Sequence, residues 1–152
     1  DGLIIATSIS SIQGRIRVYK YDNTLDEWIK HGGDIVGDAF GDNLGMSASL
    51  SDNGSIIAIG APQLAFNLGG YVKVFSFNSD KSVADENGPI GWNQVGGDIQ
   101  GKANGDFSGW SVSLSADGSF LAIGAPNNND NGPGYVSIYQ REPNKTEADE
   151  NG

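Results

Sequence analysis

The feature of this sequence that most constrains its fold is an internal repeat. The stretch SLSDNGSIIAIGAPQLAFNLGGYVKVF, residues 49–75, returns as SLSADGSFLAIGAPNNNDNGPGYVSIY, residues 113–139. Equivalent positions stay 64 residues apart outside this stretch as well, for example Trp28 and Trp92. A repeat of this kind indicates that each unit is one small assembly, which cannot bury its apolar face alone and stacks on its neighbours.

A third, partial copy stands at the start of the chain. DGLIIATS, residues 1–8, aligns with DGSFLAIG, residues 117–124, but the later triplet Gly-Ala-Pro is replaced by Ser-Ile-Ser. We expect the chain to be either a window on a longer repeat protein or a subunit whose copies supply missing strands. The copies predict a partial, shortened unit, a full unit, and a partial unit lacking its last strand, at 1–37, 38–101 and 102–152.

The units are predicted to be all-β. Short runs of strand-forming residues alternate with clusters of Gly, Asn, Asp and Ser, and no run has helical periodicity. Gly118 supplies the positive φ of a tight hairpin turn, and Pro126 is expected to end the strand before it because proline has no N–H to donate. Each full unit is expected to contain four strands. In the last unit the first three are WSVSLS (110–115), FLAIGA (120–125) and YVSIYQR (135–141), and the fourth is represented by WNQVG (92–96) of the preceding unit.

Units of four strands and 64 residues favour the blades of a β-propeller over the rungs of a solenoid. Small residues such as Gly60 suit the crowded inner part of such an assembly. Large residues suit the wider outer gaps between blades, namely Trp28, Trp92, Phe75 and Tyr139. The expected fold class is therefore all-β, with propeller-type blades of four antiparallel strands in an incomplete ring of about two and a half blades. A β-sandwich built by duplication is the alternative.

These segments resemble the FG-GAP repeat, the blade unit of the β-propeller at the head of integrin α chains and of other extracellular proteins. The matching text is GDNLGMSASLSDNGSIIAIGAP at 41–62 and GDFSGWSVSLSADGSFLAIGAP at 105–126, with Gly-Ala-Pro intact in both. Leu44 and Ser108 stand where the family has the Phe of its Phe-Gly pair. The resemblance implies a propeller with a role in adhesion or recognition.

The family often binds calcium through a loop of the type D-x-D-x-D-G-x-x-D between the first two strands of a blade. Calcium takes six to eight oxygen ligands, whereas the corresponding turns here, SDNG and ADG, hold one carboxylate each. The evenly spaced Asp34, Asp38 and Asp42 do not replace such a loop, because Lys102 takes the place of the middle aspartate one unit later. No metal ion or other cofactor is therefore expected.

Contact residues are expected in the two most divergent loops, QLAFNLG (63–69) and NNNDNGPG (127–134), because loops carry binding more often than strands do. Asn127, Asn129 and Asn131 have the spacing of the first half of a calcium loop. Asp130 is the only charged residue of this loop, and calcium affinity depends on the number of charged ligands, so we expect a surface turn. The candidates are Phe66, Asn127, Asn129, Asp130 and Asn131.

Catalytic groups are scarce. His31 is the single histidine, so a catalytic triad or a metal site built on histidines is not expected. We expect His31 in a solvated loop or at a strand edge. Adjacent Asp-Glu pairs lie in polar loops, where nothing raises a carboxyl pKa. The chain is predicted not to be an enzyme.

Composition narrows the partners. The net charge of -10 disfavours nucleic acid and anionic membranes, and no apolar run approaches the roughly 18 residues of a membrane helix. The absence of cysteine excludes disulfides and thiolate metal sites. We expect neither nucleic-acid binding nor membrane insertion.

Two Asn-x-Ser/Thr sequons, at Asn53 and Asn144, are candidate glycosylation sites. Asn144 lies in a polar loop and is expected to carry a glycan if the host is a eukaryote, whereas the tight turn at Asn53 suits a glycan less well. Together with the resemblance, the sequons suggest a non-catalytic module at the cell surface or outside the cell, which recognises a protein or a glycan. The alternative is a structural subunit that binds copies of itself in a filament or surface layer, because head-to-tail contacts need not close. An enzyme whose active site is carried by the propeller is the third hypothesis.

Overall fold

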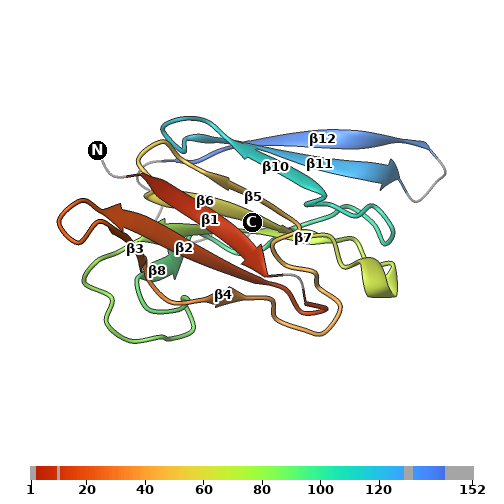
Figure 1. The fold of residues 1–152 in the computed structure, drawn as a ribbon. Helices are drawn as coiled ribbons and strands as arrows, with labels where there is room; N and C mark the ends of the chain where they lie inside the picture. The colour runs from red at the N-terminus through yellow and green to blue at the C-terminus, as the bar shows by residue number, and fades with distance from the viewer. Residues whose placement is uncertain (1–2, 10, 129–131, 143–152) are drawn as a thin grey trace.

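The computed structural model describes residues 3–9, 11–128 and 132–142, and its strands form three antiparallel sheets stacked face to face (Figure 1). Within these residues the only helical segment is the short 3₁₀ turn η1 (Leu64–Phe66). The all-β prediction is therefore confirmed. We call the three sheets the first, the middle and the last sheet.

The sheets follow one another along the chain. The first sheet contains β1 (Ile4–Ile9), β2 (Arg15–Asp22), β3 (Glu27–Lys30) and β4 (Ile35–Val36). The middle sheet contains β5 (Ser47–Leu50), β6 (Ile56–Ala61), β7 (Tyr71–Phe77), β8 (Trp92–Gln94) and β9 (Ile99–Gln100). The last sheet contains β10 (Ser111–Leu114), β11 (Phe120–Asn128) and β12 (Gly132–Gln140).

The sequence repeat is also a repeat of strand register. Ile57 pairs with Phe75 in the middle sheet, and Leu121 pairs with Tyr139 in the last sheet. Both residues of the second pair lie 64 positions after those of the first, so the same residues face the same way in both sheets. A register slip of one residue would exchange the two faces.

The predicted fourth strand is wrong in one detail. In the first sheet its place is taken by two short strands, β3 and β4, which both pair with β2. In the middle sheet β8 and β9 both pair with β7 in the same way. The interruptions are the equivalent segments HGGD (31–34) and VGGD (95–98), and paired glycines in a strand favour such a break.

The predicted end of the second strand is also wrong in the last sheet. β11 runs through Pro126 to Asn128, and β12 begins at Gly132. The pairing register contains Ala125 with Tyr135 and then Asn127 with Pro133, which skips the proline. A proline whose N–H position lies outside the ladder does not have to stop the strand.

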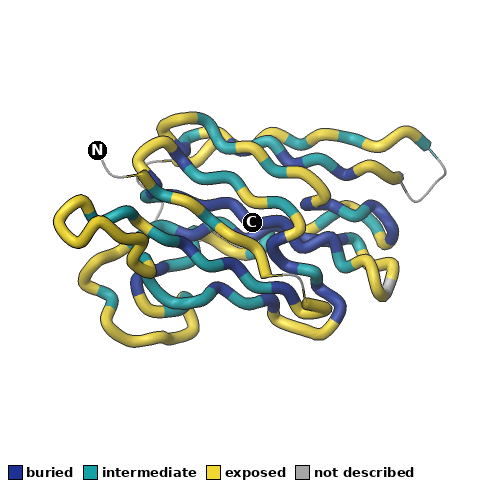
Figure 2. Tube along the Cα trace, in the orientation of Figure 1, coloured by how far each residue is buried: buried dark blue, intermediate teal, exposed yellow. Residues whose placement is uncertain are grey.

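The core lies between the sheets. Ile16 and Val18 of the first sheet pack with Ile57, Ile59 and Trp92 of the middle sheet. The opposite face of the middle sheet packs against the last sheet in a second, smaller cluster that contains Ala58, Val72, Leu121 and Ile123. Burial is accordingly concentrated in the middle sheet, and exposure in the outer sheets and the loops (Figure 2).

Candidate functional site

Each connection into the middle and last sheets contains a turn of sequence G-D-x-x-G-x-S. In the first of these turns the carboxylate of Asp42 is buried and accepts three hydrogen bonds. The donors are the backbone N–H of Ala39 at 2.7 Å, the hydroxyl of Tyr71 at 2.8 Å and Nε2 of Gln63 at 3.0 Å. Burial and the neighbouring Asp42 raise the pKa of Tyr71, so the phenol keeps its proton and remains a donor.

The second turn repeats this arrangement. The buried carboxylate of Asp106 accepts hydrogen bonds from the N–H of Ala103 and the hydroxyl of Tyr135, each at 2.9 Å. Gly105 and Gly109 have φ values of 82° and 83°. Glycine adopts this backbone without the penalty that other residues incur. The buried aspartate therefore fixes a turn whose glycines can approach another backbone closely.

Both turns pack against the sheet that precedes them. Leu44 of the first turn forms a parallel bridge with Gly14 of the first sheet, and Ser108 of the second turn forms one with Gly70 of the middle sheet. The N–H groups of Leu44 and Ser108 each donate to the residue before that glycine, at 3.2 and 2.8 Å. The first and middle sheets therefore each have a groove that receives the turn of the next unit.

The groove of the middle sheet is filled. Oγ of Ser47 donates to the carbonyl of Gly109 at 2.8 Å. A Cβ on Gly60 would lie 2.0 Å from that carbonyl oxygen, which no side chain can tolerate. Gly60 is therefore required by the close approach of the following turn, a position where strand glycines are expected.

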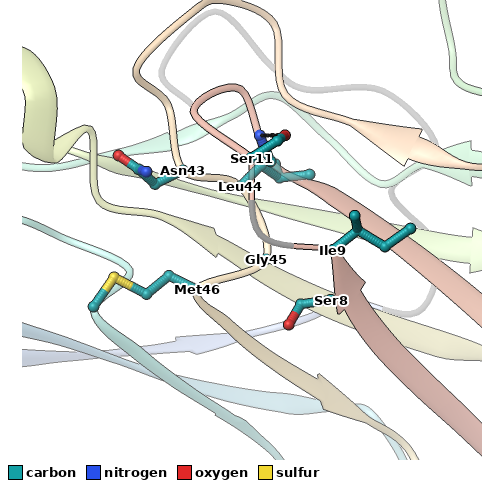
Figure 3. A pocket seen from close by; sticks show the side chains of 8 residues that line it. Ser8, Ile9, Ser11, Asn43, Leu44, Gly45 and Met46 are labelled. Carbon is teal, nitrogen blue, oxygen red and sulfur yellow. Dashed lines mark hydrogen bonds between the residues drawn. The ribbon is translucent and has the colours of Figure 1, made fainter.

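The groove of the first sheet is filled less completely. Ser8 stands where the middle sheet has Gly60, and a cavity of about 250 Å³ remains beside it. The side chains of Ser8 and Ile9 lie on one side of this cavity and the turn of residues 43–46 on the other (Figure 3). The turn lies farther from the strands here: a Cβ on Gly45 would be 3.4 Å from the carbonyl oxygen of Arg15, whereas one on the equivalent Gly109 would be 2.6 Å from that of Tyr71.

The groove of the last sheet is open. A hollow of about 290 Å³ lies there, lined by Trp110, Ser111, Gly124, Ala125, Pro126, Gly134, Tyr135 and Val136. We call this set the last-sheet groove. Each member lies 64 residues after its counterpart in the filled middle groove. A Cβ on Gly124 would meet Oγ of Ser111 at 2.3 Å and no backbone atom closer than 3.8 Å.

The family model of the FG-GAP repeat matches residues 100–139. This segment is an FG-GAP repeat. The match confirms the resemblance over the second turn, β10, β11 and most of β12, and the sequence repeats it at 36–75. No curated protein matches the chain. FG-GAP repeats occur in extracellular and cell-surface proteins and are generally non-catalytic.

The predicted contact loops leave the same end of their sheets (Figure 1). The loop of the middle sheet contains η1, and its equivalent in the last sheet spans the end of β11 and the start of β12. Phe66 is the last residue of η1, and Asn127 is exposed near the end of β11. Asn129, Asp130 and Asn131 lie outside the described residues. Their contact roles stay predictions.

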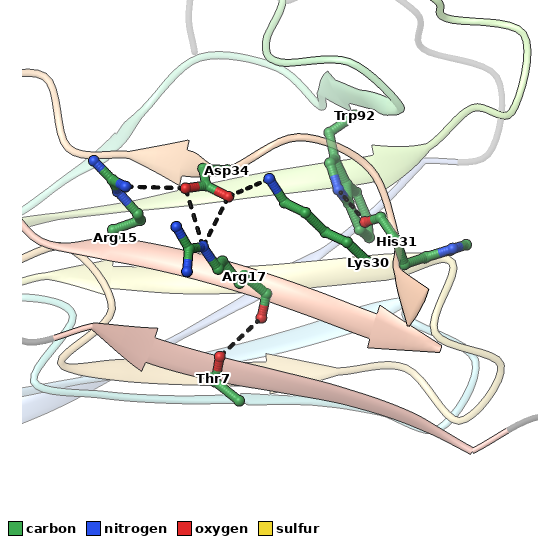
Figure 4. Close-up of polar contacts among 7 residues, drawn as sticks. All are labelled: Thr7, Arg15, Arg17, Lys30, His31, Asp34 and Trp92. Carbon is green, nitrogen blue, oxygen red and sulfur yellow. Dashed lines mark hydrogen bonds and ion pairs between the residues drawn. The ribbon is translucent and has the colours of Figure 1, made fainter. Parts of the chain in front are cut away.

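The evenly spaced aspartates are each held by protein donors. Asp34 contacts Arg15, Arg17 and Lys30 at 3.1, 3.1 and 2.5 Å (Figure 4). The hydrogen bonds from Arg17 and Lys30 lower the pKa of Asp34 to about 2. Asp38 contacts Lys73 at 2.9 Å. In the part of the chain that the structure describes, no group of three His, Cys, Asp or Glu residues could hold a metal ion.

A recurring ion pair was missed by the sequence analysis. Asp98, the equivalent of Asp34, contacts Lys73 at 2.9 Å, and Lys73 is the counterpart of Arg17. Each pair joins the aspartate of the G-G-D break to a cation on the strand beside it. Its signal was present in the sequence, because a basic residue recurs at the same place in GRIRVYKYD and GYVKVFSFN.

His31 lies at the end of β3, as the strand-edge alternative predicted, but it is not solvated. Its ring is half-buried at the edge of the contact between the first and middle sheets and stacks on Phe77, with centroids 3.7 Å apart. Nε1 of Trp92 donates to the carbonyl of His31 at 3.2 Å (Figure 4). Burial, with a smaller effect from Lys20, lowers the pKa of His31. The histidine is therefore part of the packing between sheets.

Proposed function

We propose that the three sheets are consecutive blades of a larger β-propeller-like module, which is non-catalytic and recognises a protein or a glycan at the cell surface or outside the cell. The FG-GAP repeat supports the propeller-like architecture. The acidic charge of -10 supports a partner that is neither nucleic acid nor an anionic membrane. Among the described residues, no helix has the length and apolar character needed to cross a bilayer.

The observation that carries the proposal is the exposure of the outer faces. Val72 of the middle sheet is fully buried by the last sheet, whereas its equivalent Val136 is 68% exposed. On the first sheet, Trp28 is 41% exposed, whereas its equivalent Trp92 is fully buried. Large exposed apolar side chains on the face of a sheet are a feature of interfaces, and the matching middle-sheet residues are covered by the neighbouring sheets.

The proposed recognition surface is the end of the sheets at which η1, the end of β11 and the start of β12 lie. The loops there differ most between the repeats, while the strands that support them are alike. Variable loops on a constant scaffold are a common arrangement for binding. Phe66, Asn127, Asn129, Asp130 and Asn131 are the residues proposed to contact the partner.

The second candidate function is that of a structural subunit in a filament or surface layer. Both outer faces expose large apolar side chains and lie at opposite ends of the stack, as head-to-tail addition requires. Electron micrographs of native material separate the two functions. Closed rings support the recognition module, and polymers with shared sheets support the structural subunit.

The recognition function is tested by screening the purified chain against an array of glycans and a panel of extracellular proteins. We expect a ligand whose binding weakens about tenfold or more when Phe66 and Asn127 are both changed to alanine, because few residues dominate most interfaces. Val83→Ala, in another exposed loop, is the matched control. Binding that is equally strong in the double variant and the control would exclude these loops as the site.

Glycosylation is a separate part of the proposal. Asn53 is exposed, and its Oδ1 accepts hydrogen bonds from the N–H and Oγ of Ser55, at 2.9 and 2.7 Å. Asn144 lies outside the described residues. Peptide mass mapping of material secreted by a eukaryotic host is expected to find glycan at both sites. Unmodified asparagine at both positions would contradict it.

A further inference from the structure

Gly124 has no role that the described chain explains. It lies in the interior of β11, where glycine weakens a strand because it adds backbone freedom and no packing. A Cβ there would meet only the flexible end of Ser111 at close range. A glycine in a strand often marks a place where another backbone approaches closely. None of the described residues places such a backbone against Gly124.

The middle sheet shows what an occupied groove looks like. There Gly60, the equivalent of Gly124, faces the carbonyl of Gly109, and a Cβ on Gly109 would lie 3.0 Å from Cα of Gly60. The two glycines therefore permit a backbone-to-backbone contact between a strand and the turn of the following unit. Only a turn with glycine at this position fits.

The groove also has a polar group in the corresponding place. Ser47 Oγ lies 2.4 Å from the Cβ position of Gly60 and donates to Gly109. Ser111 Oγ lies 2.3 Å from the Cβ position of Gly124. It is therefore placed to donate to the glycine carbonyl of an incoming turn. Around it, exposed apolar side chains on this face, Phe120, Val136 and Ile138, provide area to bury.

A second folded copy of this chain has no turn left to fill the groove. The pattern G-D-x-x-G-x-S occurs twice, at 41–47 and 105–111. The first turn is packed on the first sheet and the second on the middle sheet. A copy could use either turn only by breaking its own contact between sheets.

We propose that the last-sheet groove binds the G-D-x-x-G-x-S turn of an additional FG-GAP repeat, with the second glycine of that turn seated against Gly124. This inference rests on the proposed propeller-like module and specifies its next contact. The partner is defined by its chemistry: a buried aspartate that holds the turn, and a glycine whose carbonyl accepts from Ser111.

The test extends the full chain with a second copy of residues 89–152. The junction keeps the register, because ADENG at 148–152 is identical to 84–88 and the next residue is then the equivalent of Pro89. Joining the turn covalently gives it a high effective concentration. Because the chain has no cysteine, Val136→Cys is a single reporter of burial in the groove.

The rate of thiol labelling at position 136 is expected to fall about tenfold or more on extension, since a covered thiol reacts only through local opening. Val83→Cys, which replaces another highly exposed valine, is the reporter control and should label equally fast in both chains. Gly124→Val in the first copy should restore fast labelling. Gly97→Val is its matched control, because a Cβ at Gly97 meets nothing within 4 Å.

Circular dichroism of the Gly124→Val chain without the extension checks that it folds, and Gly124→Ala is the milder variant. An unchanged rate of labelling at position 136 on extension would overturn the inference. Concentration-dependent protection without the extension would also overturn it, because a second copy would then cover the face. The ligand screen with the loop variants tests the proposed function independently, so the two can fail separately.

Discussion

The middle sheet and the two outer sheets are built from equivalent residues, and they differ in what lies on each side. The middle sheet has a neighbour on both faces, and Ile57, Val72 and Trp92 are completely buried. On the outer sheets the equivalents Ile5, Val136 and Trp28 are exposed. Equivalent residues therefore have the same strand register and different burial. The repeated sequence specifies the residues on both surfaces of a blade, whether or not a neighbouring sheet covers them.

The tryptophans provide the largest expected difference. Trp92→Ala should lower the free energy of unfolding by about 3 to 5 kcal/mol, because it leaves a large cavity between the first and middle sheets. Trp28→Ala should cost about 1 kcal/mol, since much of its surface is already in water. Urea unfolding of both variants measures the difference. Similar losses would mean that the outer face of the first sheet is covered in solution.

The strand glycines sharpen the same comparison. Gly60→Ala should lower the free energy of unfolding by about 2 to 3 kcal/mol, because its Cβ collides with the carbonyl of Gly109 and forces the sheets apart. Gly124→Ala should change it by less than about 1 kcal/mol, because only the Ser111 side chain has to rotate. Thermal unfolding distinguishes them. A large loss for Gly124→Ala would indicate that its groove is already occupied.

The two cations that recur beside the G-G-D breaks should also differ. Lys73 is buried between Asp38 and Asp98, so Lys73→Met leaves two carboxylates without their shared cation and should cost about 2 kcal/mol. Arg17→Met should cost less than about 1 kcal/mol, because Asp34 keeps Arg15 and Lys30 and the pair is partly exposed. Denaturant titrations in low and high salt give both values. An equal cost at both positions would contradict the assigned difference in burial.

The smallest expected effect is the pH dependence of the contact between the first and middle sheets. Burial lowers the pKa of His31 in the folded state below its ordinary value of 6.5. The neutral ring therefore contributes stability above pH 6.5, and this contribution is lost as the pH falls below that value. The loss between about pH 7.5 and pH 5 should be a few tenths of a kcal/mol. In His31→Phe that part of the pH dependence should disappear; an unchanged pH profile would show that His31 does not titrate at the contact.

Local pattern was enough to predict the strands but not how they end. Alternation and turn residues located β5, β6, β10 and the hairpin at Gly118, because side-chain direction in a strand has a period of two residues. The break between β8 and β9 was missed, although Gly96 and Gly97 were visible in the sequence. The continuation of β11 past Pro126 was missed because the position of a proline in a ladder depends on its partner strand.

The position of the candidate site could be predicted from the sequence, but the contacts that form it could not. The divergent loops and the repeated G-D-x-x-G-x-S turn can be read from the sequence. The close approach of Gly109 to Gly60 and the hydrogen bond from Tyr71 to Asp42 cannot, because these contacts join residues 49 and 29 positions apart. His31 shows the same limit: its sequence neighbours are polar or glycine, yet its ring stacks on Phe77 of another sheet.

The amino-acid sequence by itself determined the period of 64, the strand-forming character of each unit and the alternation of side chains along its strands. These are local properties, which follow from the alternation of apolar and polar residues, from turns at glycine and from the sequence repeat. Only the tertiary structure decided which of the faces are buried, which glycines touch another backbone and which carboxylates find a cation. The reason is physical: burial and charge pairing depend on the neighbouring sheet, so repeated units with similar strands acquire different environments according to their place in the stack.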